Sequence, residues 1–122
     1  MKKILVADDT DTGLELVRTV LENHGYEVHE AKNGAEALEQ ARQIQPDLII
    51  LDLHMPILDG FGVVQELRRD AQFESTPVMA LTASAMMGDR ERAMAAGFTG
   101  YLSKPIKLSL LRAEVERLLG TK

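Results

Sequence analysis

The chain alternates short, uninterrupted apolar runs with longer stretches in which apolar residues recur at helical spacing. Residues 4–7, 48–51 and 78–81 form such runs, which are typical of strands covered on both faces. Residues 26–31 and 99–102 are short or interrupted by polar side chains, so they are predicted to lie at the edges of the sheet. The pattern therefore predicts five strands.

A helix is predicted after each of these strands. Thr12 and Glu15 have the spacing of a capping box at the start of the first helix, and Gly25 suits its end. Lys107 is a poor N-cap for the last helix. The second helix is expected to begin at Asn33, the third to begin after Asp59, and the fourth to run from Met86 to Ala96. The fifth helix is expected to carry its apolar residues on one stripe: Leu108, Leu111, Val115 and Leu118.

Five strand–helix units joined by short connections predict an α/β fold with a doubly wound, five-stranded parallel sheet and helices on both faces. We adopt the strand order 2-1-3-4-5, known from flavodoxin-like folds, because it places the two most polar strands at the edges. Residues 1–122 are expected to form one domain, since the chain has room for a single compact core.

Composition narrows the classes of protein. The chain has no cysteine, which excludes a disulfide framework or a thiolate metal site and fits a cytoplasmic location. Its longest apolar run is too short to cross a membrane, so no membrane partner is expected. A net charge of -5 argues against direct binding to nucleic acid.

Charged residues follow three of the predicted strands. Asp8 and Asp9 follow the first, Asp52 ends the third, and Lys104 follows the fifth. The carboxyl ends of parallel strands share one edge of the sheet, so these groups are predicted to form one site. Clustered carboxylates suit Mg²⁺, and an ionised aspartate can attack phosphorus. Lys104 and the hydroxyl of Thr82 could then bind the phosphoryl oxygens.

The segments ILVADD, DLIILDLHMPILDG, VMALTASAM and GYLSKP occur in this order, and with them the chain resembles a response-regulator receiver domain of two-component signalling from Lys3 to Leu119. The resemblance implies a metal site, a phosphoacceptor and a switch pair, and a cis bond before Pro105. The implied magnesium ligands are Asp8 (often through water), Asp9, Asp52 and the backbone carbonyl of His54. Asp52 is also the implied phosphoacceptor, and Lys104 would contact the phosphoryl group. Thr82 and Tyr101 match the switch pair.

The resemblance also implies a function and its partners. A histidine kinase or a histidine phosphotransfer protein would donate a phosphoryl group to Asp52, and the change would reach a protein target through the surface of the fourth helix, fifth strand and fifth helix. The protein would then catalyse only its own phosphorylation and slow dephosphorylation. One of Met86 and Met87 is interpreted as a partner contact, and His54 and Ser84 occupy positions that tune hydrolysis.

Two alternatives stay open at this point. The chain could be a receiver from a hybrid histidine kinase, because the segments TASAM and GYLSKP resemble receivers found there as well. It could also be a small aspartate-based phosphatase. Asp9-Thr10-Asp11 faintly resembles the haloacid-dehalogenase motif, with Asp9 as nucleophile and Asp11 as general acid, although Gly13 departs from that motif.

Overall fold

The computed structural model describes residues 1–83 and 88–120. Ser84, Met86 and Met87 lie outside the described residues, and with them the expected start of the fourth helix. The elements, in chain order, are β1 (Lys3–Ala7), α1 (Asp11–Asn23), β2 (Glu27–Ala31), α2 (Gly34–Ile44), β3 (Leu48–Asp52), α3 (Gly60–Arg69), a 3₁₀ turn (Ala71–Phe73), β4 (Val78–Thr82), α4 (Asp89–Ala96), β5 (Gly100–Ser103) and α5 (Leu108–Leu119).

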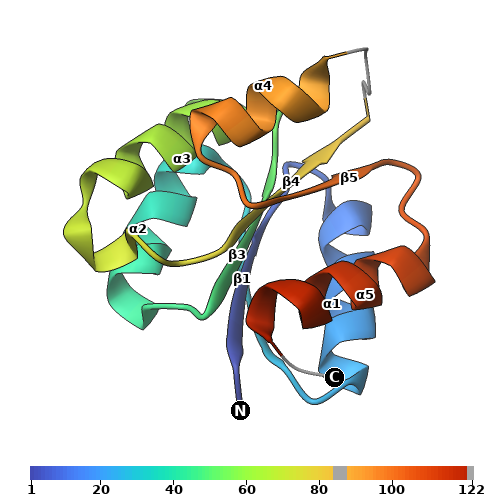
Figure 1. Cartoon of the computed structure of the whole chain (residues 1–122). Coiled ribbons are helices and arrows are strands. Elements are labelled where there is room, and N and C mark those ends of the chain that lie inside the picture. Colours follow the sequence, from blue (N-terminus) through green and yellow to red (C-terminus); the bar gives the residue numbers. More distant parts are fainter. Residues whose placement is uncertain (84–87, 121–122) are drawn as a thin grey trace.

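The strands form one parallel sheet in the order β2-β1-β3-β4-β5, as predicted (Figure 1). Every residue of the central strands β3 and β4 is buried, whereas β2 and β5 at the two edges are partly exposed. The uninterrupted apolar runs thus mark the strands that neighbours cover on both sides and both faces. None of the helices formed by the described residues is long and apolar enough to cross a membrane.

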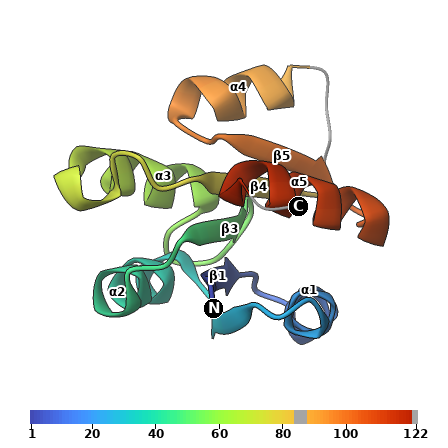
Figure 2. The same ribbon diagram turned by 60° about the horizontal axis from the view of Figure 1, so that its bottom comes forward.

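Helices cover both faces of the sheet (Figure 2). One face packs against α2, α3 and α4, and the other against α1 and α5, so each face has its own apolar cluster. Alternate residues of one strand serve the two clusters: Leu5 and Ile49 pack on the first face, and Ile4 and Ile50 on the second. Because all strand pairs are parallel, the carboxyl ends of the strands lie at one edge of the sheet.

The predicted helix starts are confirmed at Asn33 and Asp59, whose side chains accept hydrogen bonds from N–H groups of the first turn. Lys107 makes no side-chain cap, as its residue type predicts. The prediction of a capping box formed by Thr12 and Glu15 is wrong. Thr10 is the N-cap of α1, and its hydroxyl accepts from Gly13 N–H. The helix begins earlier because Thr10 is also fixed by a contact with Asp8.

The C-terminal end of α4 is anchored by a half-buried cation. The guanidinium of Arg68, on α3, donates to the carbonyls of Gly97 (3.0 Å), Phe73 (2.7 Å) and Thr76 (2.7 Å). Burial lowers the pKa of this group, and no carboxylate among the described residues forms an ion pair with it. Of the eight residues of α4 itself, only Ala93 is buried, so the anchor lies beyond the end of the helix.

The edge strand β5 is covered in part by α5. Glu114 Oε2 accepts a hydrogen bond from the backbone N–H of Tyr101 (3.3 Å), and Arg117 donates to the carbonyl of Thr99 (3.0 Å). The two side chains also pair with each other at 2.7 Å. Together they occupy backbone groups that an exposed edge strand would otherwise offer to another chain.

This arrangement gives a pH-dependent stability. The hydrogen bond from Arg117 lowers the pKa of Glu114 and outweighs the opposing effect of burial. A lowered folded pKa means that the stabilisation is complete above the unfolded value of about 4.3 and is lost as the pH falls through the folded value. We expect Glu114→Gln to flatten the acid limb of the stability–pH curve. Urea unfolding at several pH values measures this, and an unchanged acid limb would contradict it.

Candidate functional site

The topology gathers the predicted site residues at one edge of the sheet. Asp8 follows β1, Asp52 ends β3, Thr82 ends β4 and Lys104 follows β5. Strand order reverses between β1 and β3, which is the point where open α/β sheets form their ligand crevice. Residues that are far apart in the sequence therefore meet for a topological reason.

The three aspartates form one acidic cluster. Asp8, Asp9 and Asp52 each offer a carboxylate oxygen, and these oxygens lie within 4.8 Å of one another. Asp8 and Asp52 are 1% and 5% exposed, whereas Asp9 lies at the surface. Like charges so close repel, and burial strengthens the repulsion, so the cluster needs positive charge.

Lys104 supplies part of that charge. Its Nζ donates to Asp8 Oδ2 and to Asp52 Oδ2, both at 2.9 Å. Burial opposes the charged forms, but hydrogen bonding and attraction dominate: the pKa of Asp8 is lowered and that of Lys104 is raised. Both groups are therefore ionised near neutral pH.

Asp8 is further held by Thr10, a residue that the sequence analysis did not assign to the site. The backbone N–H and the hydroxyl of Thr10 both donate to Asp8 Oδ1 at 3.0 Å. Gly13 packs so closely that a Cβ there would clash with Asp8 Oδ2 and lie 2.7 Å from Thr10 Oγ1. The sequence signal that could have indicated this contact is Thr10, two residues after Asp8, followed by Gly13 three residues later.

Asp52 is positioned by the loop that follows it. The backbone N–H of His54 donates to Asp52 Oδ1 at 2.9 Å, while the His54 residue itself is exposed. The start of α3 approaches from behind, since a Cβ on Gly60 would lie 2.6 Å from the Asp52 carbonyl oxygen. One carboxylate oxygen of Asp52 thus bonds to backbone, and the other bonds to Lys104.

Thr82 and Tyr101 lie on the adjacent strands β4 and β5. Thr82 is fully buried at the end of β4 and pairs in register with Ser103 of β5, two residues beyond Tyr101. Tyr101 is half-buried and packs against the core on the α3–α4 face. Burial, followed by the charges of Asp89 and Glu91, raises its pKa, so its hydroxyl is neutral. The Lys104–Pro105 bond is cis, as the resemblance to receiver domains implied.

The residues present fit a magnesium ion. The donors are all oxygens, which Mg²⁺ prefers. Three carboxylates and one ammonium leave two negative charges, which a divalent cation would balance. The ammonium of Lys104 lies between Asp8 and Asp52, which shows that these carboxylates attract a cation.

Fold and site together define a doubly wound α/β domain with an acidic, lysine-bearing crevice at its switch point. The sequence matches the response regulator receiver domain over residues 4–116. The chain therefore belongs to the response regulator receiver domain family, and is a receiver domain of two-component signalling. The haloacid-dehalogenase interpretation of Asp9 and Asp11 is not needed to explain any part of the chain.

The relatives include response regulators and the receiver domain of a sensor histidine kinase. The chain is 37% identical to the polar-differentiation response regulator DivK of Brucella anthropi, covering 98% of this chain and 97% of that one. It is 35% identical to the chemotaxis protein CheY4 of Vibrio cholerae, with a TM-score of 0.91 over 98% of this chain and 99% of that one. It is 32% identical, with a TM-score of 0.90 over 98% of both chains, to the receiver domain of sensor histidine kinase PA1611 from Pseudomonas aeruginosa, solved with magnesium in the active site cleft.

Proposed function

We propose that the protein is a phosphorylation-controlled switch in which Asp52 takes a phosphoryl group from a phosphohistidine. The donor would be a histidine kinase or a histidine phosphotransfer protein, acting in the cytoplasm. The observation that carries the proposal is the setting of Asp52: a buried carboxylate, 2.9 Å from Lys104 Nζ, in a cluster with Asp8 and Asp9. Structural aspartates do not need this combination, but a phosphoacceptor does.

Each residue has a role in the transfer. A carboxylate oxygen of Asp52 attacks phosphorus, the phosphorus–nitrogen bond breaks, and the imidazole leaves with the electron pair and takes up a proton. Lys104, already adjacent to Asp52, donates to the phosphoryl oxygens, and Thr82 adds its hydroxyl. Asp9, Asp52 and the His54 carbonyl would hold Mg²⁺ directly, and Asp8 through water. When bound, the ion supplies charge that neutralises the phosphoryl oxygens.

The protein is in this proposal a signalling module rather than an enzyme with an external substrate. Its chemistry is limited to its own phosphorylation and a slow dephosphorylation of Asp52. The same proposal holds for a single-domain regulator, such as the DivK relative, and for a receiver of a histidine kinase, such as the PA1611 relative.

Phosphorylation with a small donor tests the proposal. Acetyl phosphate and Mg²⁺ should add one phosphoryl group to the protein, and the group should be lost in hydroxylamine, as an acyl phosphate is. After trypsin, the label should lie in residues 43–68, the peptide between Arg42 and Arg68 that contains Asp52. EDTA should prevent labelling. A label on another peptide, or full labelling in EDTA, would refute the assignment.

The signal would leave the site through Thr82 and Tyr101 and reach the surface formed by α4, β5 and α5. The phosphoryl group carries about -1.5 to -2 charges at neutral pH, and its bond to Thr82 would favour one of two arrangements of this surface. Tyr101 sits between the core and this surface, so a change in its packing alters both.

We expect Thr82→Ala to separate phosphorylation from the response. Asp52 and Lys104 keep their contacts, so the variant should still be labelled, within about tenfold of the wild-type rate, since it loses one neutral hydrogen bond. The amide chemical shifts of β5 and α5 should change much less on addition of beryllofluoride than in wild type. Ser103→Ala serves as the control on the neighbouring strand. An equal response in Thr82→Ala would exclude this route.

A further inference from the structure

Asp8 and Asp52 divide their carboxylate oxygens in the same way. In each, Oδ1 accepts the backbone N–H of the residue two positions later, from Thr10 at 3.0 Å in one case and from His54 at 2.9 Å in the other. In each, Oδ2 accepts from Lys104 Nζ. At Asp8 the hydroxyl of Thr10 is an additional donor, also at 3.0 Å from Oδ1.

The Thr10 hydroxyl also belongs to α1. It accepts a hydrogen bond from the Gly13 N–H at 3.2 Å, which makes Thr10 the N-cap of this helix. A hydroxyl has one proton to donate, and this proton is directed to Asp8 Oδ1. An N–H at the positive end of the helix is thus connected to the carboxylate through one hydroxyl, and hydrogen bonds in such a chain strengthen one another.

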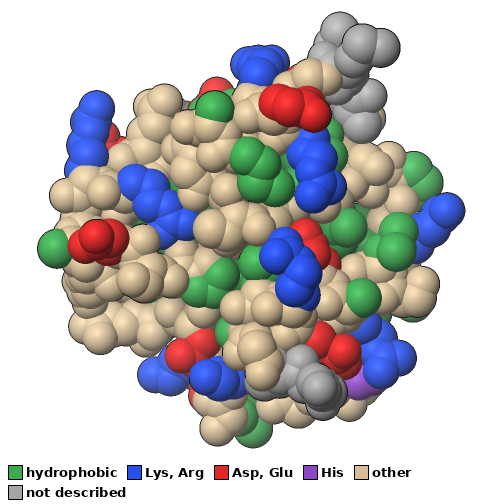
Figure 3. Space-filling view, viewed as in Figure 1, with side chains coloured by type: hydrophobic (Ala, Val, Ile, Leu, Met, Phe, Trp, Pro, Cys, Tyr) green, Lys and Arg blue, Asp and Glu red, His purple; other side chains and the backbone are tan. Residues whose placement is uncertain are grey.

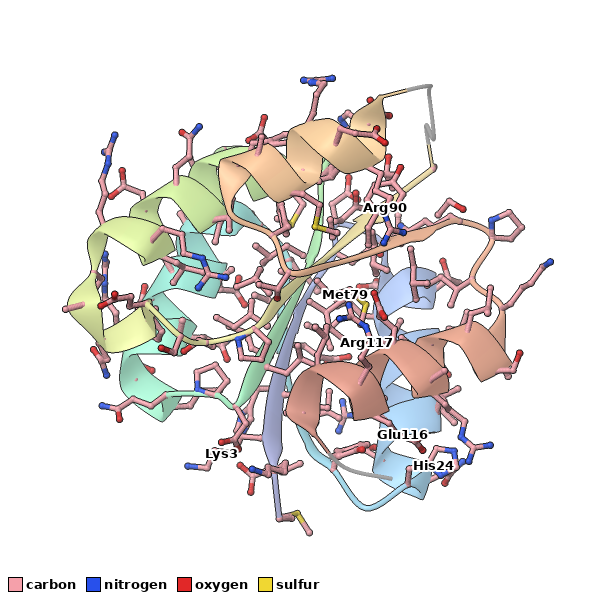
Figure 4. All side chains as sticks on the ribbon, in the orientation of Figure 1. Lys3, His24, Met79, Arg90, Glu116 and Arg117 are labelled. Carbon is pink, nitrogen blue, oxygen red and sulfur yellow. The ribbon has the colours of Figure 1, made fainter. Side chains whose placement is uncertain are left out.

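The first turn of α1 depends on this contact more than the rest of the helix does. The buried residues of α1 begin at Leu14, whereas Asp11 and Thr12 are exposed. At the other end of the helix, His24 lies beside Glu116 of α5, and both line one small hollow (Figure 4). Thr10 therefore holds the end of α1 that lies next to the acidic cluster.

We infer that Thr10 is a positioning residue for the metal site. By occupying Asp8 Oδ1 it leaves Oδ2 as the oxygen that faces Lys104 and the crevice. Asp8 is only 1% exposed, so water could not replace the two bonds if the carboxylate turned away from Thr10. The cap of α1 thereby selects the orientation in which Asp8 contributes to the cluster.

The inference rests on the proposed function, in which the cluster holds Mg²⁺, and it adds a coupling to that function. If the ion binds best when Thr10 holds Asp8, then the bound ion must stabilise the Thr10 contact by the same factor. The Gly13 N–H is bonded to the same hydroxyl. Mg²⁺ should therefore slow hydrogen exchange of the Gly13 amide, although this amide is not a ligand of the ion.

Three substitutions separate the donor role of Thr10 from its capping role. Thr10→Ser keeps both hydrogen bonds of the hydroxyl. Thr10→Gly removes the donor, but glycine is itself an adequate N-cap residue, so most of the helix stability is kept. Thr10→Val removes both roles at nearly constant shape. Thr12→Val is the matched control, because it makes the same change at an exposed threonine of the first turn.

The measurements use the full chain. Titration calorimetry gives the Mg²⁺ affinity, urea unfolding in EDTA gives the stability of the metal-free protein, and NMR gives the exchange rate of the Gly13 amide with and without Mg²⁺. All of the substitutions are neutral, and charges of both signs are interspersed over the surface (Figure 3). The variants therefore leave the long-range attraction of the protein for a cation unchanged.

We expect Thr10→Gly and Thr10→Val to bind Mg²⁺ about tenfold more weakly than wild type, as expected for the loss of a hydrogen bond to a charged group. Thr10→Ser should restore the affinity to within about twofold, and Thr12→Val should not change it. Only Thr10→Val should lose stability in EDTA. In wild type, saturating Mg²⁺ should slow Gly13 exchange at least about threefold.

Two results would overturn the inference alone. One is wild-type Mg²⁺ affinity in Thr10→Gly together with reduced stability of Thr10→Val, which would make Thr10 a helix cap only. The other is a Gly13 exchange rate that Mg²⁺ does not change in wild type. A wild-type protein that binds no Mg²⁺ would instead contradict the metal site of the proposed function, and the inference with it, so the two failures are distinguishable.

Discussion

Replacing Asp52 with asparagine is expected to abolish phosphorylation, to below about one part in a thousand of the wild-type rate, because the amide cannot act as the nucleophile. The change is nearly isosteric. The amide oxygen can still accept from His54 N–H or from Lys104, which are the contacts that hold Asp52 now. The variant should fold, and its circular dichroism and denaturation midpoint show whether it does. Labelling with acetyl phosphate and Mg²⁺ measures the loss.

Asp11→Asn provides the matched control for this experiment. Asp11 is an exposed carboxylate close in sequence to the cluster, and it pairs with Lys32 rather than with the site. Its replacement should leave labelling within about twofold of wild type, since exposed ion pairs contribute little. If Asp52→Asn keeps its label and Asp9→Asn loses it, the nucleophile would be Asp9 and the present assignment would be wrong.

Gly13→Ala is expected to damage the metal site more than the fold. Its Cβ would collide with the Asp8 carboxylate and the Thr10 hydroxyl, so Asp8 must move away from Lys104. We expect Mg²⁺ affinity to fall about tenfold or more, a change of about 1.4 kcal/mol. The free energy of unfolding should fall by less than about 2 kcal/mol, because alanine favours the helix by up to 1 kcal/mol and offsets part of the overpacking.

Titration calorimetry with Mg²⁺ and thermal unfolding with and without the ion separate the two effects. Thr12→Ala is the control, because Thr12 is exposed on the same turn of α1 and does not bond to Asp8. It should keep the stabilisation by Mg²⁺ that Gly13→Ala loses. Unchanged affinity in Gly13→Ala would mean that Asp8 has no part in holding the ion.

Much of the fold follows from local pattern in the sequence. The apolar runs of β3 and β4 predict buried central strands, and the polar residues of β2 predict an edge, because a parallel sheet exposes only its edges. Asp8, Asp52 and Lys104 were predicted to meet, since each follows or ends a strand of one parallel sheet. The strand order itself came from known folds, because pattern alone does not fix which strands are neighbours.

The features that were missed depend on tertiary contacts. Thr12 with Glu15 fits the capping rule, yet Thr10 is the cap, because its hydroxyl also bonds to Asp8. The spacing of Glu114 and Arg117 predicts a pair on one helix face, but not that the pair covers the backbone of β5. Such contacts join segments whose proximity only the folded chain determines.

The three carbonyls that accept hydrogen bonds from Arg68 determine which end of α4 is free to move. Arg68 fixes the loop at Gly97, directly after α4, whereas α4 itself buries only the small Ala93. A helix that is fixed at one end and buries few residues along its length can rotate about the fixed end. Its displacement is then smallest at that end and grows with distance from it. A displacement of α4 is therefore expected to move Arg90, in its first turn, more than Ala96, which lies next to Gly97.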